Sequence, residues 1–186
     1  MDLLGHSMGG AVSLRVTLAR PDLVRSLILM DTSGWSFAPL DPDIASFMAG
    51  FMESFDPADG LPDLTAHANP EEDLIAAATP PQWRAVKEQM ASGFDPCALK
   101  ALGRDLFDST TAGVGPRLGE IVCPVSVIVG EYDHPFVDQA ADLAAAVANG
   151  NLTVIQGAYH SPQLTHRVEW TAAVEAHFVR ARSSAR

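Results

Sequence analysis

The feature that most constrains this chain is the stretch Gly5-His6-Ser7-Met8-Gly9-Gly10, which contains the pattern G-x-S-x-G. A short apolar run, Met1 to Leu4, precedes it, and a segment with helical periodicity follows at once. In a strand–corner–helix context this pattern forms a strained turn, with the serine Oγ projecting above a sheet. Side chains two residues before and two residues after the serine are expected to collide there, so glycines are used. The motif alone leaves a second interpretation open, a plain turn whose serine caps the following helix.

The composition is that of a globular protein and argues against several kinds of partner. The 186 residues, 47% of them hydrophobic, suffice for one domain with a sizeable core. The 12 Lys and Arg against 23 Asp and Glu give a formal net charge of -11, which argues against binding to nucleic acid or to an anionic membrane. No signal peptide and no membrane-spanning run is recognisable. Cys97 and Cys123 form neither a disulfide framework nor a zinc-type spacing, so we expect a cytoplasmic protein.

Strand-like and helix-like segments alternate at both ends of the chain. Short apolar, β-branched runs predict parallel strands over Asp2 to Gly5, Ser26 to Asp31, Val125 to Gly130 and Leu152 to Gln156. Helices are predicted over Met8 to Arg20, Val137 to Ala148 and Gln163 to about Arg180. The first carries two apolar stripes and is expected to be buried on most sides. The last is expected to face inward with Leu164, Val168, Trp170 and Ala172. This alternation predicts an α/β class with a parallel sheet of about four strands flanked by helices.

The middle of the chain has no clear strand pattern. Four helical pieces are expected there, near residues 43–55, 71–78, 82–92 and 96–107. A connection of this length cannot be a plain loop, so we interpret residues 35–118 as an all-helical cap inserted into a core made of residues 1–34 and 119–186. The stripe Phe47, Phe51 and Phe55 either lines a pocket or forms the buried face of a cap helix.

Three residues with catalytic chemistry each follow a predicted strand. Ser7 follows the first, Asp133 follows the strand ending at Gly130, and His160 follows the last. Because the carboxyl ends of parallel strands meet at one edge of a sheet, we expect these side chains to lie close together. Alternatives remain open for each. His160 is otherwise a core or surface histidine, and Asp133 is otherwise a helix cap. Asp31 also follows a strand and is the rival acid, or else a turn residue.

Three blocks, in this order, resemble the α/β-hydrolase fold family, and in particular its esterase, lactonase and haloperoxidase-like branch with a helical cap. The blocks are Leu4 to Gly10, Cys123 to Asp133 and Gly157 to Pro162. The resemblance implies a nucleophilic Ser7, a general base at His160, an orienting acid at Asp133 and an oxyanion donor at the Met8 N–H. It implies hydrolysis of an ester, lactone or related acyl bond of a small molecule through an acyl-serine intermediate. No metal or cofactor is implied.

The chain departs from that family at its N-terminus. Complete members have further strands before the strand that leads into the nucleophilic serine, and a loop in that earlier part supplies a second oxyanion donor. We therefore expect this chain to be an N-terminally truncated part of a longer hydrolase. The strand before Ser7 then becomes an unprotected apolar edge, which invites self-association. The alternative function is a catalytically impaired fragment, or a binding partner that completes its sheet with another polypeptide. Acyl transfer and C–C bond cleavage by the same triad also remain open.

Overall fold

The computed structural model describes residues 1–35, 113–134 and 136–184, with residues 46, 50, 70–78, 80, 93, 95–98, 100 and 101 of the segment between them. Contacts between residues divide the chain into two units, Met1–Trp35 with Ala112–Arg186, and Ser36–Thr111. In the second unit, helix α3 spans Pro70–Ala78 and confirms the helix predicted near residues 71–78. The Phe47, Phe51 and Phe55 stripe lies outside the described residues.

The first unit is built on a four-stranded sheet in the order β1-β2-β3-β4, with every neighbouring pair parallel. The strands are β1 (Asp2–His6), β2 (Ser26–Met30), β3 (Val125–Gly130) and β4 (Gly150–Ile155). The two central strands, β2 and β3, are buried along their whole length, as continuous apolar runs predict. The predicted sheet is thereby confirmed. Strand β4 begins earlier than predicted, because Gly150 already pairs with Val125.

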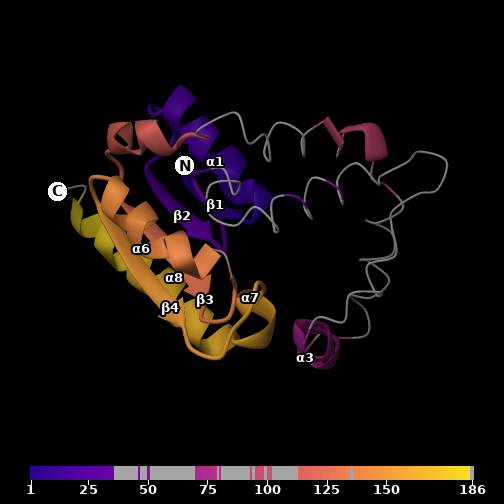
Figure 1. Ribbon diagram of the computed structural model, residues 1–186. Helices are drawn as coiled ribbons and strands as arrows, with labels where there is room; N and C mark the ends of the chain where they lie inside the picture. The colour runs from indigo at the N-terminus through magenta and orange to yellow at the C-terminus, as the bar shows by residue number, and fades with distance from the viewer. Residues whose placement is uncertain are drawn as a thin grey trace. The chain divides into compact units, whose positions relative to one another are not determined.

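Helices cover both faces of this sheet (Figure 1). They are α1 (Met8–Ala19), α6 (Phe136–Ala146), α7 (Pro162–Thr165) and α8 (Arg167–Ser184), with a 3-10 helix, η2 (Gly115–Glu120). Alternate residues of β2 point to opposite faces, so Leu29 packs in the cluster that contains Leu14 of α1 and Leu143 of α6. Met30 packs in a second cluster with Ala173 of α8. None of the described helices combines the length and the apolar character that crossing a bilayer requires.

Helix α1 is less buried than its two apolar stripes suggested. Val12 and Val16 are exposed, and the buried face consists of Gly10, Ser13, Leu14 and Thr17. The Ser13 hydroxyl donates to the Gly9 carbonyl oxygen at 2.7 Å, and the Thr17 hydroxyl donates to that of Ser13 at 2.8 Å. Because these bonds satisfy the hydroxyl groups, small polar residues can line the sheet side of the helix. The prediction of a helix buried on most sides was wrong for this reason.

The predicted C-terminal helix is in fact two helices. The break falls at His166, whose φ of -128° and ψ of 54° are not helical. Helix α8 then restarts at Arg167 and buries Ala173, His177 and Ala181, whereas Val168 is 79% exposed. The predicted inward side was wrong for Val168 and Ala172, which are exposed, whereas Trp170 packs against the second cluster as predicted. The difference arises because an interruption resets the phase of a helix relative to the sheet.

The buried His177 makes stability depend on pH. Its side chain is 1% exposed, and its Nδ1 lies 2.9 Å from the Ser126 hydroxyl oxygen. Burial, and then the positive charge of Arg180, lowers the pKa of His177 below its usual 6.5. The unfolded chain therefore binds a proton here before the folded chain does, and the free energy of unfolding should fall as the pH drops below 6.5. We expect His177→Gln to flatten this dependence in urea unfolding curves measured from about pH 7.5 to 5.5. An unchanged pH dependence would contradict the assignment.

Candidate active site

Ser7 occupies the corner between β1 and α1 in a backbone conformation that residues with a side chain avoid. Its φ is 53° and its ψ is -124°. The Ser7 N–H donates to the Met30 carbonyl oxygen at 2.9 Å. The Ser7 carbonyl oxygen accepts from the Thr32 hydroxyl at 2.7 Å and from the Gly10 N–H at 2.9 Å. These bonds from β2, the loop after it and α1 hold the corner in place, so the strained conformation is kept.

The glycines around Ser7 are required at two positions, only one of which the sequence argument identified. A Cβ on Gly5 would lie 2.4 Å from the Ser13 Oγ, and one on Gly10 would lie 2.4 Å from the Thr32 Cγ2. A Cβ on Gly9 would meet nothing within 4 Å in the described part of the chain. The prediction that glycine is needed two residues after the serine was therefore wrong. The close contact falls one residue later, where α1 passes Thr32.

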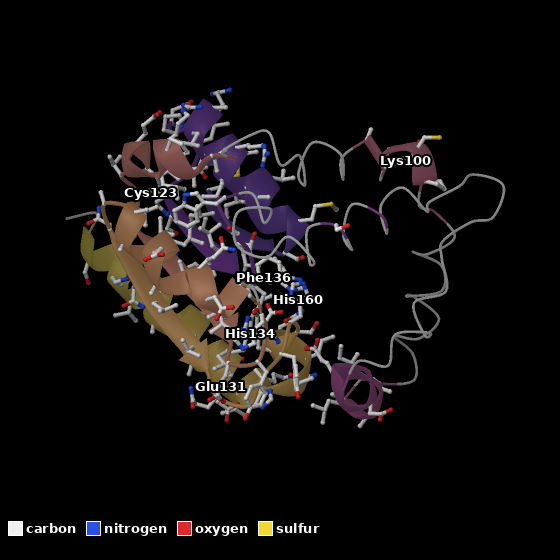
Figure 2. All side chains as sticks on the ribbon, in the orientation of Figure 1. Lys100, Cys123, Glu131, His134, Phe136 and His160 are labelled. Carbon is white, nitrogen blue, oxygen red and sulfur yellow. The ribbon has the colours of Figure 1, made fainter. Side chains whose placement is uncertain are left out.

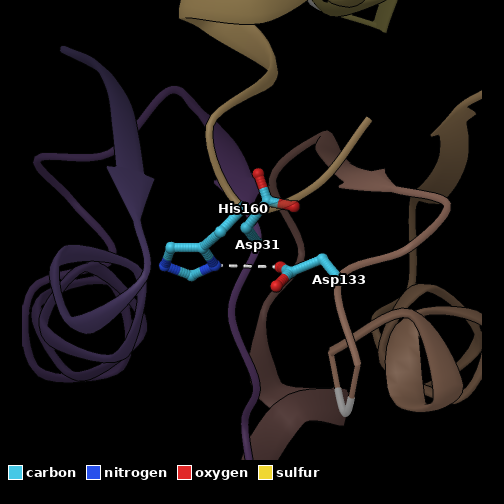
Figure 3. Close-up of side chains that lie close together, drawn as sticks. All are labelled: Asp31, Asp133 and His160. Atoms are coloured by element: carbon cyan, nitrogen blue, oxygen red, sulfur yellow. Dashed lines mark hydrogen bonds and ion pairs between the residues drawn. The ribbon is translucent and has the colours of Figure 1, made fainter. Parts of the chain in front are cut away.

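Asp133 and His160 lie side by side at the ends of β3 and β4 (Figure 3). The His160 Nδ1 is 2.9 Å from the Asp133 Oδ2. A carboxylate only accepts, so Nδ1 holds the proton and Nε2 is left as the basic atom of the neutral ring. Asp133 is buried, while His160 is partly exposed. This pairing of a buried carboxylate with an accessible imidazole is the arrangement of a general base and the acid that orients it.

The loops that carry Asp133 and His160 are bonded to each other along their length. The Glu131 carboxylate accepts from the Gly157 N–H at 2.8 Å, and the Tyr132 N–H donates to the Ala158 carbonyl oxygen at 2.9 Å. The site therefore depends on Glu131, which no pattern in the sequence marks. Its neighbour in the loop, His134, points to a separate partner, Asp138, at 2.9 Å and is exposed.

Asp31, the rival acid, lies in the same cluster. It is fully buried, and its Oδ1 accepts from the Gly130 N–H at 2.9 Å. Asp31, Asp133 and His160 each offer one donor atom, and these atoms lie within 4.8 Å of one another. A group of this kind could also hold a metal ion, although two of its side chains are already bonded to each other. The geometry favours Asp133 over Asp31 as the partner of the imidazole, because the His160 Nδ1–H donates its hydrogen bond to Asp133.

Within the described residues, no hydrogen bond links Ser7 to the pair formed by Asp133 and His160. Among the residues that the structure describes, the Ser7 hydroxyl makes no hydrogen bond, either to the helix that it precedes or to His160. The alternative in which Ser7 merely caps α1 is therefore not supported. The Met8 N–H likewise has no acceptor in the described part of the chain, so this donor is available to a bound group. Contacts between nucleophile and base commonly tighten only when substrate binds.

Two rings contact His160 that the sequence argument did not assign to the site. The ring of Phe136, at the start of α6, lies 5.3 Å from that of His160 (Figure 2). The ring of His6 lies 4.8 Å away, and the His6 Nε2 is 2.7 Å from the His160 carbonyl oxygen. In the sequence, adjacency to Ser7 is the one signal that points to a place for His6 near the site.

Comparisons with known proteins agree with this fold. The family model described as "Alpha/beta hydrolase family" matches residues 2–174. Polyketide synthase ThaQ of Burkholderia thailandensis is 32% identical over 177 residues, which make up 92% of this chain and 8% of ThaQ. MenH from S. aureus superposes with a TM-score of 0.74 at 22% identity, over 97% of this chain and 68% of MenH. A thermophilic esterase from Thermogutta terrifontis gives a TM-score of 0.65 at 20% identity, over 97% of this chain and 65% of the esterase.

This chain thus spans about two thirds of each solved structure and a small part of the polyketide synthase. At these identities the solved structures support the fold alone. The match to the family model covers the candidate site as well, because residues 2–174 include the corner at Ser7 and the two loops that hold Asp133 and His160. We conclude that the chain belongs to the alpha/beta hydrolase family.

Proposed function

We propose that the site is that of a serine hydrolase acting on an ester, lactone or related acyl bond of a small molecule. The Ser7 oxygen attacks the acyl carbon while the His160 Nε2 takes the hydroxyl proton. Asp133 holds the ring and stabilises its positive charge, and the Met8 N–H donates to the oxygen that becomes negative. His160 then gives the proton to the leaving group, and water releases the acyl group from Ser7 by the same steps.

The observation that most supports this proposal is the hydrogen bond between His160 Nδ1 and Asp133 Oδ2, at the same edge of the sheet as the strained Ser7 corner. The bond fixes the tautomer that a base needs. The strained serine is the second support, because such conformations persist mainly at functional sites. The thermophilic esterase among the similar structures fits the same reaction class. A cytoplasmic location is part of the proposal, and so is a cap role for the part of the predicted insertion that forms the second unit, Ser36–Thr111.

Labelling with a fluorophosphonate probe tests the proposal directly. The probe reacts with an activated serine, so we expect wild-type protein to be labelled and Ser7→Ala to remain unlabelled. Ser183→Ala is a matched control, because this serine is exposed on α8 and its hydroxyl donates to the Val179 carbonyl oxygen at 3.1 Å. It should label as the wild type does. Equal labelling of Ser7→Ala and wild type would overturn the proposal, and p-nitrophenyl acetate hydrolysis by the same variants provides a second readout.

A second candidate is a catalytically impaired chain that completes its sheet with another polypeptide. The observation in its favour is the edge strand β1, which among the described strands pairs only with β2 and leaves Leu4 42% exposed. Such an edge can pair with a further strand, including that of a second copy. A sample that unfolds cooperatively, resists the probe and sediments as more than a monomer would favour this candidate over the hydrolase.

A further inference from the structure

His6 connects the corner that holds Ser7 to the loop that holds His160. It is the last residue of β1, directly before Ser7, and its backbone pairs with Met30 of β2. Its side chain is mostly buried, and its Nε2 lies 2.7 Å from the carbonyl oxygen of His160. A carbonyl oxygen only accepts hydrogen bonds, so the proton of this bond belongs to His6 Nε2. The interaction therefore fixes the His6 tautomer as well as the position of the His160 backbone.

The loop around His160 is otherwise held from the β3 side. Asp133 holds the His160 ring, and Tyr132 bonds to Ala158 just before it. Neither contact sets the distance between the His160 imidazole and Ser7, which lies at the corner between β1 and α1. The bond from His6 is a side-chain contact that joins the Ser7 corner and the His160 loop directly. A misplacement of about 1 Å in such an arrangement can cost about 10²-fold in rate.

We propose that His6 is a positioning residue, which holds His160 at a fixed distance from Ser7 while remaining a neutral hydrogen-bond donor. This inference rests on the proposed function of Ser7 and His160. Neutrality matters because the rings of His6 and His160 lie only 4.8 Å apart, and His160 becomes positive during the proposed reaction. A second positive charge at that distance would oppose proton uptake by His160.

The surroundings of His6 keep it neutral. Burial, and then the nearby charge of His160, lowers the pKa of His6 below its usual 6.5, although the hydrogen bond to the His160 backbone and the charge of Asp133 act in the opposite direction. The donor role does not need the charged form, because neutral imidazole has one N–H. His6 can therefore hold the loop at neutral pH without competing with His160 for the proton.

Two substitutions of His6 distinguish the effect of its hydrogen-bond donor from the effect of its aromatic ring. His6→Gln keeps a neutral N–H donor of similar reach, and His6→Phe keeps a ring but removes the donor. We expect His6→Phe to lower kcat for p-nitrophenyl acetate by about 10²-fold with little change in KM, and to slow fluorophosphonate labelling of Ser7 in proportion. His6→Gln should recover most of this loss. Wild-type rates in His6→Phe, or equal losses in both variants, would overturn the inference while leaving the role of Ser7 intact.

An NMR measurement tests the inference without any catalytic activity, and so it applies even if the probe does not label the wild-type protein. Imidazole ¹H–¹⁵N correlation spectra of the wild-type protein at neutral pH should show His6 protonated at Nε2 alone. The Nδ1–H signal of His160 should shift in His6→Phe and stay near its wild-type position in His6→Gln. A His6 ring protonated at Nδ1 would overturn the inference, whatever the outcome of the labelling experiment.

Discussion

Replacing Asp133 with Asn is expected to lower kcat for p-nitrophenyl acetate by about 10⁴-fold with the fold intact. Asn keeps the size of the side chain but removes the negative charge that faces His160. Its amide can also donate to the ring, which would favour the tautomer with a proton on Nε2. That tautomer cannot accept the Ser7 proton. Kinetics with the purified variant measure the loss, and an unchanged melting temperature shows that it arises from the site.

The matched control is the same substitution at Asp31. Asn at this position still offers an oxygen to the Gly130 N–H, which Asp31 bonds at 2.9 Å. The control therefore keeps this hydrogen bond while it removes the charge of the rival acid, and we expect a far smaller loss of kcat than in Asp133→Asn. A larger loss in Asp31→Asn would transfer the acid role from Asp133 to Asp31. Comparable losses in both would mean that the two carboxylates share the charge of His160.

The positions of Asp133 and His160 along the chain were sufficient to predict that these two side chains meet beyond the ends of β3 and β4. Ser7, Asp133 and His160 each follow a run that reads as a strand, and the run Val125–Gly130 is both β-branched and apolar. Parallel strands bring their carboxyl ends to one edge of the sheet, so order along the chain becomes proximity in space. The strands were predictable because their signal is local and repeated over several residues.

The contacts that fix the site were not predictable, because they depend on register and on close approach between distant segments. The bond from His6 to the His160 carbonyl oxygen and the bond from the Gly157 N–H to the Glu131 carboxylate join residues far apart in the sequence. The phase of α8 after the break at His166 also depends on the sheet beneath it. Gly10 is an example of a requirement that the sequence alone does not predict. Its need for glycine comes from Thr32, which packs against it only once β2 has paired with β1.

Replacement of Gly130, the last residue of β3, is expected to damage both stability and site geometry. A Cβ there would lie 2.1 Å from the Tyr159 carbonyl oxygen and 2.6 Å from that of Ala158. Both are backbone atoms, so no side chain can rotate away to make room. The same two segments are bonded through Tyr132 and Ala158 at 2.9 Å, which resists their separation.

Gly130→Ala must therefore move the loop that leads into His160, or the end of β3 that leads into Asp133. We expect the free energy of unfolding to fall by about 1–3 kcal/mol, which is the usual cost of overpacking. The rate of fluorophosphonate labelling at Ser7 should fall by about 10²-fold, since His160 would be displaced from Ser7. Gly119→Ala in η2 is the control, because its Cβ would meet nothing closer than the Ala146 carbonyl oxygen at 3.9 Å. Urea unfolding and labelling of both variants would refute this account if Gly130→Ala behaved as Gly119→Ala does.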